Sequence, residues 1–223
     1  MPLKRHYIDF QKQTNNKVTP DEIDRYEQYV VSNPAISATF YGTTTPGTVS
    51  QALTLTLANT VSDFPRSIAA HFSGSASVSG TATVTGKNQF GETISESMGI
   101  AQGTQTTGIG YGTKIFAEIS AATVAMGTGV SGTGTVSLGV PTVAGSAKFG
   151  LPAKIGGSTD VKALTWSGEA GVSVPLNGGT IGAYIDTVNH SFVGTETLAG
   201  TMTYSVLFKP SYYKDSLALM ANL

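Results

Sequence analysis

Alternation of apolar and small polar residues runs through most of this 223-residue chain from Pro34 onward. Because successive side chains of a β-strand point to opposite faces, a period of two indicates strands with one buried face. Valine and threonine, which favour pleated and half-buried surfaces, supply many of these positions. The clearest runs have their apolar members at Leu53, Leu55, Leu57, Ala82, Val84, Ile94, Met98, Ile115, Ala117, Ile119, Val124, Met126, Val136, Leu138, Val140, Val172, Val174, Tyr204, Val206 and Phe208. Such a chain is restricted to mainly β architectures.

Turn residues separate these runs at short intervals. Residues 87–92 join two alternating runs and predict a hairpin loop, in which Gly91 is free to adopt a positive φ. Asn177-Gly178 is a second strong turn signal. Short strands with frequent glycine-rich turns predict an antiparallel β-sandwich or barrel-like domain.

The first 33 residues differ in character from the rest of the chain. They carry ten charged side chains, whereas the much longer stretch 34–208 carries fourteen. Residues 1–18 are polar, show neither strand nor helix periodicity, and predict an extended arm. The boundaries expected from these changes are an arm with a short helix at 1–33, a β domain at 34–208 with two sub-sheets divided near 141–160, and a C-terminal tail at 209–223.

A short α-helix is predicted from Pro20 to Val31. Thr19 suits the N-cap, Pro20 suits the first helical position, and Glu22 completes the spacing of a capping box. The apolar stripe expected on this helix consists of Ile23, Tyr26 and Val30.

The composition argues against several classes of function. Thirteen basic and fourteen acidic residues give a net charge of −1, without the basic excess that binding to nucleic acid requires. The chain has no cysteine, so thiolate metal sites and disulfides are excluded. The N-terminal residues do not form a signal peptide, and no segment approaches the roughly 20 apolar residues of a membrane helix. We therefore expect neither a nucleic-acid partner nor a membrane partner.

No arrangement of residues predicts catalysis, a cofactor or a metal ion. No serine has glycine at both flanking positions, which excludes a Gly-x-Ser-x-Gly nucleophile elbow. Asp186 precedes His190 by four residues, but this segment is predicted to be strand or loop, so the two side chains are interpreted as unrelated surface groups. Trp166, the single tryptophan, is expected in the core or at a subunit interface. The sequence predicts a protein that is not an enzyme.

Four segments together resemble small structural proteins of tailed bacteriophages. They are Pro65–Ile68, the hairpin region Gly80–Glu96, and Gly112–Ile119 followed by Lys148–Pro152. The resemblance covers about residues 65–155 and implies a virion protein made in the host cytoplasm. The kind that it implies first is a head decoration (cement) protein, which binds the major capsid protein or other virion subunits and stabilises the assembled head. A tail or head-to-tail joining component is the first alternative, and a cell-surface or carbohydrate-binding β module is the second.

On this interpretation the important residues contact partner subunits. We expect a homo-oligomer, with a trimer preferred by analogy with capsid-binding proteins. The C-terminal members of the contact set are equally expected to fold back on the domain core. The predicted contact residues are Lys4, Arg5, Tyr7, Phe10, Ile23, Tyr26, Val30, Phe208, Tyr212, Tyr213, Leu217 and Leu219.

Overall fold

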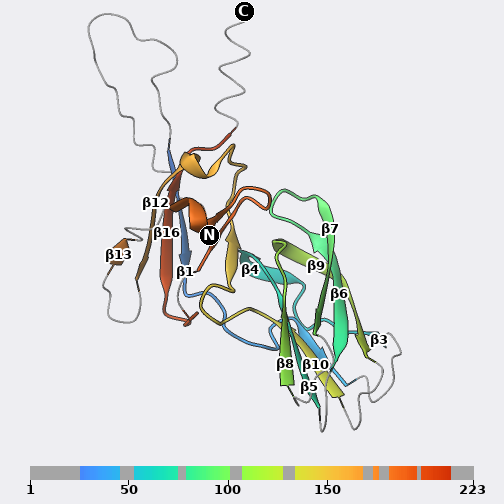
Figure 1. Ribbon diagram of the computed structural model, residues 1–223. Helices are drawn as coiled ribbons and strands as arrows, with labels where there is room; N and C mark the ends of the chain where they lie inside the picture. Colours follow the sequence, from blue (N-terminus) through green and yellow to red (C-terminus); the bar gives the residue numbers. More distant parts are fainter. Residues whose placement is uncertain are drawn as a thin grey trace, which may run out of the picture.

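The computed structural model describes residues 26–45, 53–74, 79–100, 107–127, 134–167, 173–175, 181–194 and 197–211. Within these ranges the chain is mainly β and every strand pairing is antiparallel, which confirms the predicted fold class (Figure 1). The strands are β1 (Glu27–Ser32), β2 (Gly42–Thr44), β3 (Leu53–Thr54), β4 (Val61–Arg66), β5 (Ala69–Gly74), β6 (Gly80–Lys87), β7 (Thr93–Ile100), β8 (Thr107–Tyr111), β9 (Phe116–Met126), β10 (Gly134–Gly139), β11 (Lys148–Gly150), β12 (Val161–Ser167), β13 (Ser173–Pro175), β14 (Ile185–Asp186), β15 (Ser191–Val193) and β16 (Thr203–Phe208). Two short 3₁₀ helices, η2 (Ser158–Asp160) and η3 (Ile181–Tyr184), complete the described elements.

The described strands form three sheets. The terminal sheet has the order β1-β16-β12-β13 and so joins the first described strand to the last. A second sheet has the order β2-β10-β5-β8, and we call it the uncharged sheet because its strands contain no Asp, Glu, Lys or Arg. The large sheet has the order β14-β15-β11-β4-β9-β6-β7, with β3 paired to β9. In Figure 1 the terminal sheet lies on the left, the uncharged sheet lies at the bottom, and β6, β7 and β9 lie on the right.

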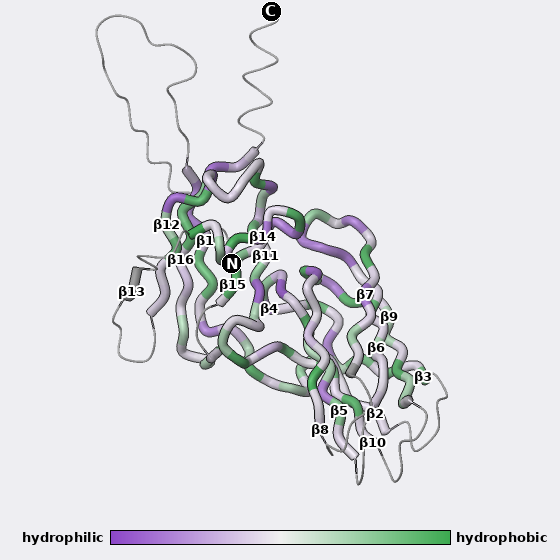
Figure 2. The backbone as a smooth tube through the Cα atoms, viewed as in Figure 1, coloured by the Kyte–Doolittle hydropathy of each residue, from purple (hydrophilic) through white to green (hydrophobic). Residues whose placement is uncertain are grey.

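Two clusters of buried side chains hold these sheets together. The first core cluster lies between the uncharged sheet and β6, β7 and β9, and includes Phe72, Phe116 and Leu138. The second core cluster packs the terminal sheet against β11 and β15, which Figure 2 labels beside it. At its centre Phe149 stacks on Phe192 with the ring centroids 5.5 Å apart, and the Tyr204 ring lies 5.5 Å from that of Phe149. The large sheet contributes strands to both clusters, so it connects the two halves of the molecule.

A buried arginine reinforces this connection. Arg66, at the end of β4, is 1% exposed and donates from Nη1 to both carboxylate oxygens of Asp63, at 2.7 and 3.0 Å. Its Nη2 donates to the Ala35 carbonyl oxygen at 3.0 Å, and its guanidinium carbon lies 5.2 Å from the centroid of the Phe149 ring. Both terminal nitrogens of the guanidinium therefore have hydrogen-bond partners, as a buried charged group requires.

The hairpin predicted at residues 87–92 is confirmed. Strands β6 and β7 pair from Gly80 opposite Ile100 to Lys87 opposite Thr93. Gly91 has a φ of 80°, a left-handed conformation that glycine adopts without the penalty of a Cβ atom. The turn at Asn177-Gly178 lies outside the described residues.

The helix predicted from Pro20 to Val31 is wrong from Glu27 onward. Residues 27–32 form β1, whose register with β16 runs from Glu27 opposite Phe208 to Ser32 opposite Thr203. Tyr29 and Val31 are buried, whereas Val30 is 43% exposed, so the burial follows a period of two. Pairing with a distant strand overrode the local helix signals, and residues 27–32 belong to the β body. Residues 20–25 lie outside the described part.

Candidate functional site

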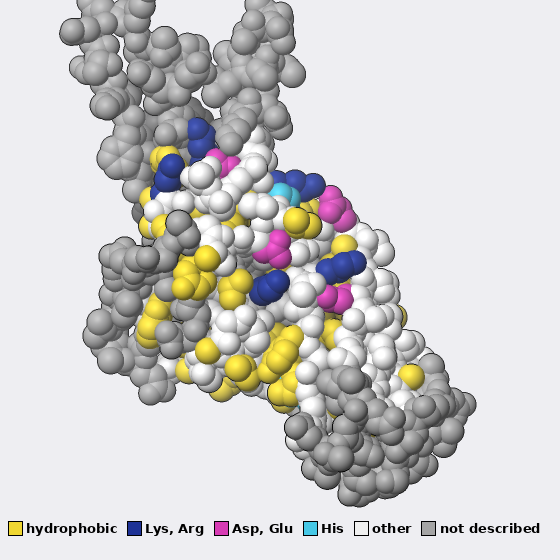
Figure 3. All heavy atoms as spheres, in the orientation of Figure 1, with side chains coloured by type: hydrophobic (Ala, Val, Ile, Leu, Met, Phe, Trp, Pro, Cys, Tyr) yellow, Lys and Arg dark blue, Asp and Glu magenta, His cyan; other side chains and the backbone are white. Residues whose placement is uncertain are grey.

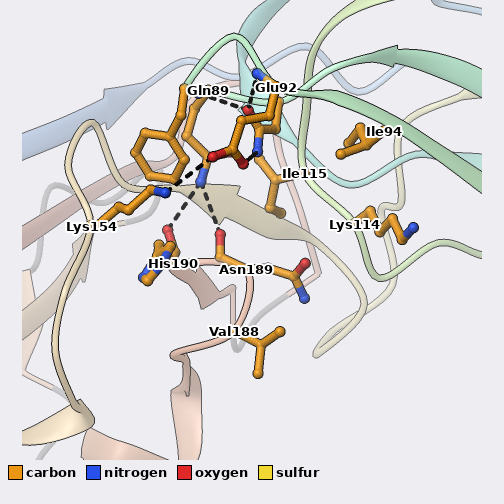
Figure 4. Close-up of a pocket in the computed structure, with 11 residues that line it drawn as sticks. Gln89, Glu92, Ile94, Lys114, Ile115, Lys154, Val188, Asn189 and His190 are labelled. Carbon is orange, nitrogen blue, oxygen red and sulfur yellow. Dashed lines mark hydrogen bonds and ion pairs between the residues drawn. The ribbon is translucent and has the colours of Figure 1, made fainter.

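A pocket of about 250 Å³ lies where the β6–β7 hairpin tip meets the C-terminal half of the chain. The hairpin contributes residues 88–90, 92 and 94, and the turn between β14 and β15 contributes residues 188–190 (Figure 4). Lys114 and Ile115, just before β9, and Lys154, in the loop after β11, complete the lining. The lining combines apolar side chains with amides, two lysines, one carboxylate and one histidine.

Asn88 shapes the hairpin side of the pocket. Its Oδ1 accepts hydrogen bonds from the backbone N–H groups of Phe90 and Glu92, both at 2.9 Å. Its Nδ2 donates to Glu92 Oε2 at 2.8 Å. An asparagine side chain that bonds backbone groups two and four residues ahead fixes the turn locally, and Gly91 supplies the left-handed residue that the turn needs.

Polar side chains of the pocket form contacts across the junction. Lys154 Nζ lies 3.1 Å from Glu92 Oε1 and 5.2 Å from the centroid of the Phe90 ring. Gln89 Nε2 donates to the Asn189 carbonyl oxygen at 2.9 Å. The His190 ring meets the Phe90 ring edge to face, with the two centroids 5.5 Å apart. These contacts hold the hairpin tip against the turn between β14 and β15.

The electrostatics of the pocket favour fixed protonation states near neutral pH. Hydrogen bonds from Asn88, followed by the hydrogen bond and charge of Lys154, hold the pKa of Glu92 below its ordinary value. Partial burial, followed by the nearby Lys154 charge, lowers the pKa of His190. The neutral form of the histidine is therefore favoured, and its Nδ1 accepts a hydrogen bond from the Ile155 N–H at 3.3 Å.

Asp186 and His190 share one turn but bond different partners. Partial burial acts to raise the pKa of Asp186, but hydrogen bonds from Asn189 and the charge of Lys148 lower it overall. Its Oδ1 accepts from the backbone N–H groups of Val188 and Asn189, each at 3.0 Å, and its Oδ2 accepts from Asn189 Nδ2 at 2.7 Å. The carboxylate thus stabilises the turn that carries His190, a residue whose φ is 47°.

This arrangement is suited to joining two parts of a protein. The pocket lining contains no serine, threonine or cysteine that could act as a nucleophile. Across the described ranges, no group of three or more His, Asp or Glu side chains is arranged to hold a metal ion. Sequence reasoning missed this junction because its partners lie up to about a hundred residues apart, and no local pattern relates Gln89 to Asn189.

Few of the predicted contact residues lie in the described part of the chain. Lys4, Arg5, Tyr7, Phe10, Ile23, Tyr212, Tyr213, Leu217 and Leu219 are outside it. The Tyr26 ring lies 6.0 Å from Lys162 Nζ, and Val30 points away from the core. Phe208 is fully buried in the second core cluster, so it packs inside its own chain and its side chain is not on the surface. Trp166 is partly buried against the same cluster, which agrees with the first of its two expected places, the core or a subunit interface.

Uncharged surfaces are the second candidate feature. On the outer face of the terminal sheet, Gln28, Val30 and Ser32 of β1 lie beside Leu207, Ser205 and Thr203 of β16, and then Ala163, Thr165 and Ser167 of β12, with no charge among them. On the uncharged sheet, β8 exposes Ile109 and Tyr111, at 38% and 42%. Figure 3 shows the charged side chains gathered on the upper and middle parts of one face, and the coloured and white atoms below them are mainly uncharged.

Comparisons with protein-family models, with curated protein sequences and with solved structures find no match to this chain. Among the described residues, none of the helices has the length and apolar character needed to cross a membrane.

Proposed function

We propose that this chain is a non-catalytic structural subunit of a tailed-phage virion, and specifically a decoration protein that binds the outside of the assembled head. The observation that carries the proposal is the uncharged sheet, whose strands lack charged residues and whose edge strand β8 exposes Ile109 and Tyr111. Centres of protein interfaces are depleted of Lys, Glu and Asp and enriched in aromatic side chains, which fits such a surface.

The pocket at the hairpin tip supports the same proposal. Its lysines are engaged with other groups of the chain: Lys154 with Glu92, and Lys114 Nζ with the Ser95 carbonyl oxygen at 2.6 Å. Lysines engaged in this way stabilise a junction and have little capacity left for binding a substrate. The partners that follow from the proposal are the major capsid protein or other virion subunits.

Co-sedimentation with phage heads tests the proposal. We would mix the purified chain with heads of the phage whose genome encodes it, and centrifuge them through a sucrose cushion. The chain should pellet with the heads, and the double variant Ile109→Asp, Tyr111→Asp should remain in the supernatant, because burying a charge at an interface is costly. Val61→Asp is the matched control, since Val61 is 63% exposed on β4, outside the uncharged sheet, and its variant should still pellet.

Two results would contradict the head assignment. If the wild-type chain stays in the supernatant with heads but pellets with purified tails, it is a tail component. If it pellets with neither, it is not an external virion subunit of this kind.

A further inference from the structure

Strand β1 is the outermost strand on one side of the terminal sheet. Of the described strands, only β16 pairs with it, and this pairing has no bulge over Glu27–Ser32. Natural edge strands are commonly protected by lysine, proline or bulges that prevent pairing with another chain. β1 has none of these devices in its six residues. Its outer edge is therefore suited to receiving another strand.

The hydrogen-bond pattern shows which backbone groups face that edge. The Asn33 N–H donates to the Met202 carbonyl oxygen at 2.9 Å, in continuation of the register that pairs Ser32 with Thr203. In an antiparallel ladder, hydrogen-bonded and non-hydrogen-bonded residue pairs alternate. The odd-numbered residues of β1 therefore bond to β16, and the N–H and C=O groups of Gln28, Val30 and Ser32 point to the open edge.

The edge residues Gln28, Val30 and Ser32 of one copy can pair with the same three residues of a second copy. If a second copy runs antiparallel around a two-fold axis at Val30, Val30 lies opposite Val30 of the other copy, and Gln28 lies opposite its Ser32. This is the register in which all three residues with outward backbone groups pair with one another, so the two strands exchange hydrogen bonds at three successive hydrogen-bonded pairs. A shift by one residue would place buried side chains beside exposed ones.

The side chains also fit this register. On the core side it brings Tyr29 opposite Val31, both of which are already buried. On the outer side it brings together two copies of Val30, which is 43% exposed in the single chain. Glu27, the one charged residue of β1, comes opposite the position of Asn33, so no like charges meet.

We infer that two copies of this chain associate through β1, antiparallel about a two-fold axis at Val30, and join their terminal sheets into one continuous sheet. Two-fold contacts between identical surfaces are the commonest form of homo-oligomer. This geometry yields a dimer in place of the trimer expected by analogy. The inference does not depend on the proposed role in the virion, because it concerns the purified chain alone.

Cysteine cross-linking tests the register, since the chain contains no cysteine of its own. Cα atoms of a hydrogen-bonded antiparallel pair are about 5.5 Å apart, within the range of a disulfide. Under mild oxidation, full-length Val30→Cys should form a covalent dimer. Ser32→Cys is the matched control, because the four-residue offset between its two copies separates them by about 14 Å, and it should remain monomeric on a non-reducing gel.

Sedimentation equilibrium tests the association without cross-linking. The wild-type chain should sediment at twice its mass of 23.0 kDa. Val30→Pro removes an N–H that faces the open edge and bonds nothing in β16, so it should yield a folded monomer with an unchanged strand signal in circular dichroism. Val61→Lys, a change at an exposed valine of β4, should remain dimeric. A wild-type monomer at micromolar concentration would overturn the inference, as would equal cross-linking of Val30→Cys and Ser32→Cys.

Discussion

At the scale of single residues, Asp63 should have a large effect on stability, because it is the charged partner of the buried Arg66. Asp63→Asn removes the charge that compensates a guanidinium with 1% exposure. Loss of one partner of a buried pair costs about 3–5 kcal/mol, and because the Asp63 side chain is 23% exposed we expect a loss of about 3 kcal/mol in the free energy of unfolding. Urea denaturation followed by circular dichroism measures it.

Glu118→Gln is the matched control for Asp63→Asn, since it makes the same chemical change in an exposed pair. Glu118 lies 3.7 Å from Lys87, and the two side chains are 47% and 55% exposed. Surface pairs of this kind contribute less than about 1 kcal/mol. Equal losses in the two variants would show that the buried arginine does not depend on Asp63.

Two histidines make stability depend on pH. Burial lowers the pKa of His71 and, together with the Lys154 charge, that of His190, below the ordinary value of 6.5. The unfolded chain then binds protons more readily than the folded chain, so the free energy of unfolding is highest above about pH 6.5 and falls as the pH drops towards the folded-state pKa values. Denaturant titrations at about pH 7.5 and about pH 5.5 should show this decrease.

Substituting each histidine in turn measures its own contribution to the pH dependence of the free energy of unfolding. His71→Gln and His190→Gln should each reduce the decrease between the two pH values, because glutamine does not titrate. The lowered pKa values of Glu92 and Asp186 affect stability only at more acidic pH, below their ordinary range near 4. Unchanged pH dependence in both variants would contradict the assignment.

At the scale of elements, two positions in one hairpin require glycine for different physical reasons. A Cβ atom at Gly86 would collide with the Glu118 carbonyl oxygen, where β6 and β9 shift register. A Cβ atom at Gly91 would meet nothing within 4 Å, but the residue has a φ of 80°. We expect Gly86→Ala to cost about 3 kcal/mol or more, and Gly91→Ala about 1–2 kcal/mol.

Thermal and urea unfolding of both variants would check this order. Gly145→Ala is the control for the conformational part alone, because Gly145 has a φ of 75° and free space around it. Its loss in the free energy of unfolding should be close to that of Gly91→Ala. If Gly86→Ala is the mildest of the three, the close approach of β6 and β9 is not what requires glycine.

Local patterns predicted strands and the hairpin well, and failed where distant pairing decided the structure. The run at 81–85 and Gly91 carried their own signals, namely alternation and turn chemistry. For residues 27–31, the capping box at Thr19 and Glu22 favoured a helix. These residues form a strand because they pair with β16, some 170 residues away in the sequence. The burial of Arg66 and the junction at Gln89 depend on partners that no local pattern reveals.

At the scale of the whole molecule, the large sheet should make unfolding cooperative. It supplies β6 and β9 to the first core cluster and β11 and β15 to the second, and β4 pairs with both β9 and β11. Neither cluster can lose its packing without exposing strands of this shared sheet. Scanning calorimetry should therefore show one transition, with the calorimetric enthalpy equal to the van't Hoff enthalpy. Two resolved transitions would mean that the clusters are independent.

The pairing of β1 with β16 also has a consequence for how the chain is made. The first core cluster is built from residues 41–140 and can fold before translation of the chain is complete. Strand β1 emerges early, but its partner at Thr203–Phe208 is synthesised about 170 residues later. At about 5–20 residues per second, this delay is on the order of ten seconds or longer. During that interval β1 has no β16 to pair with, so a nascent chain is exposed to premature pairing with its neighbours on the same messenger RNA.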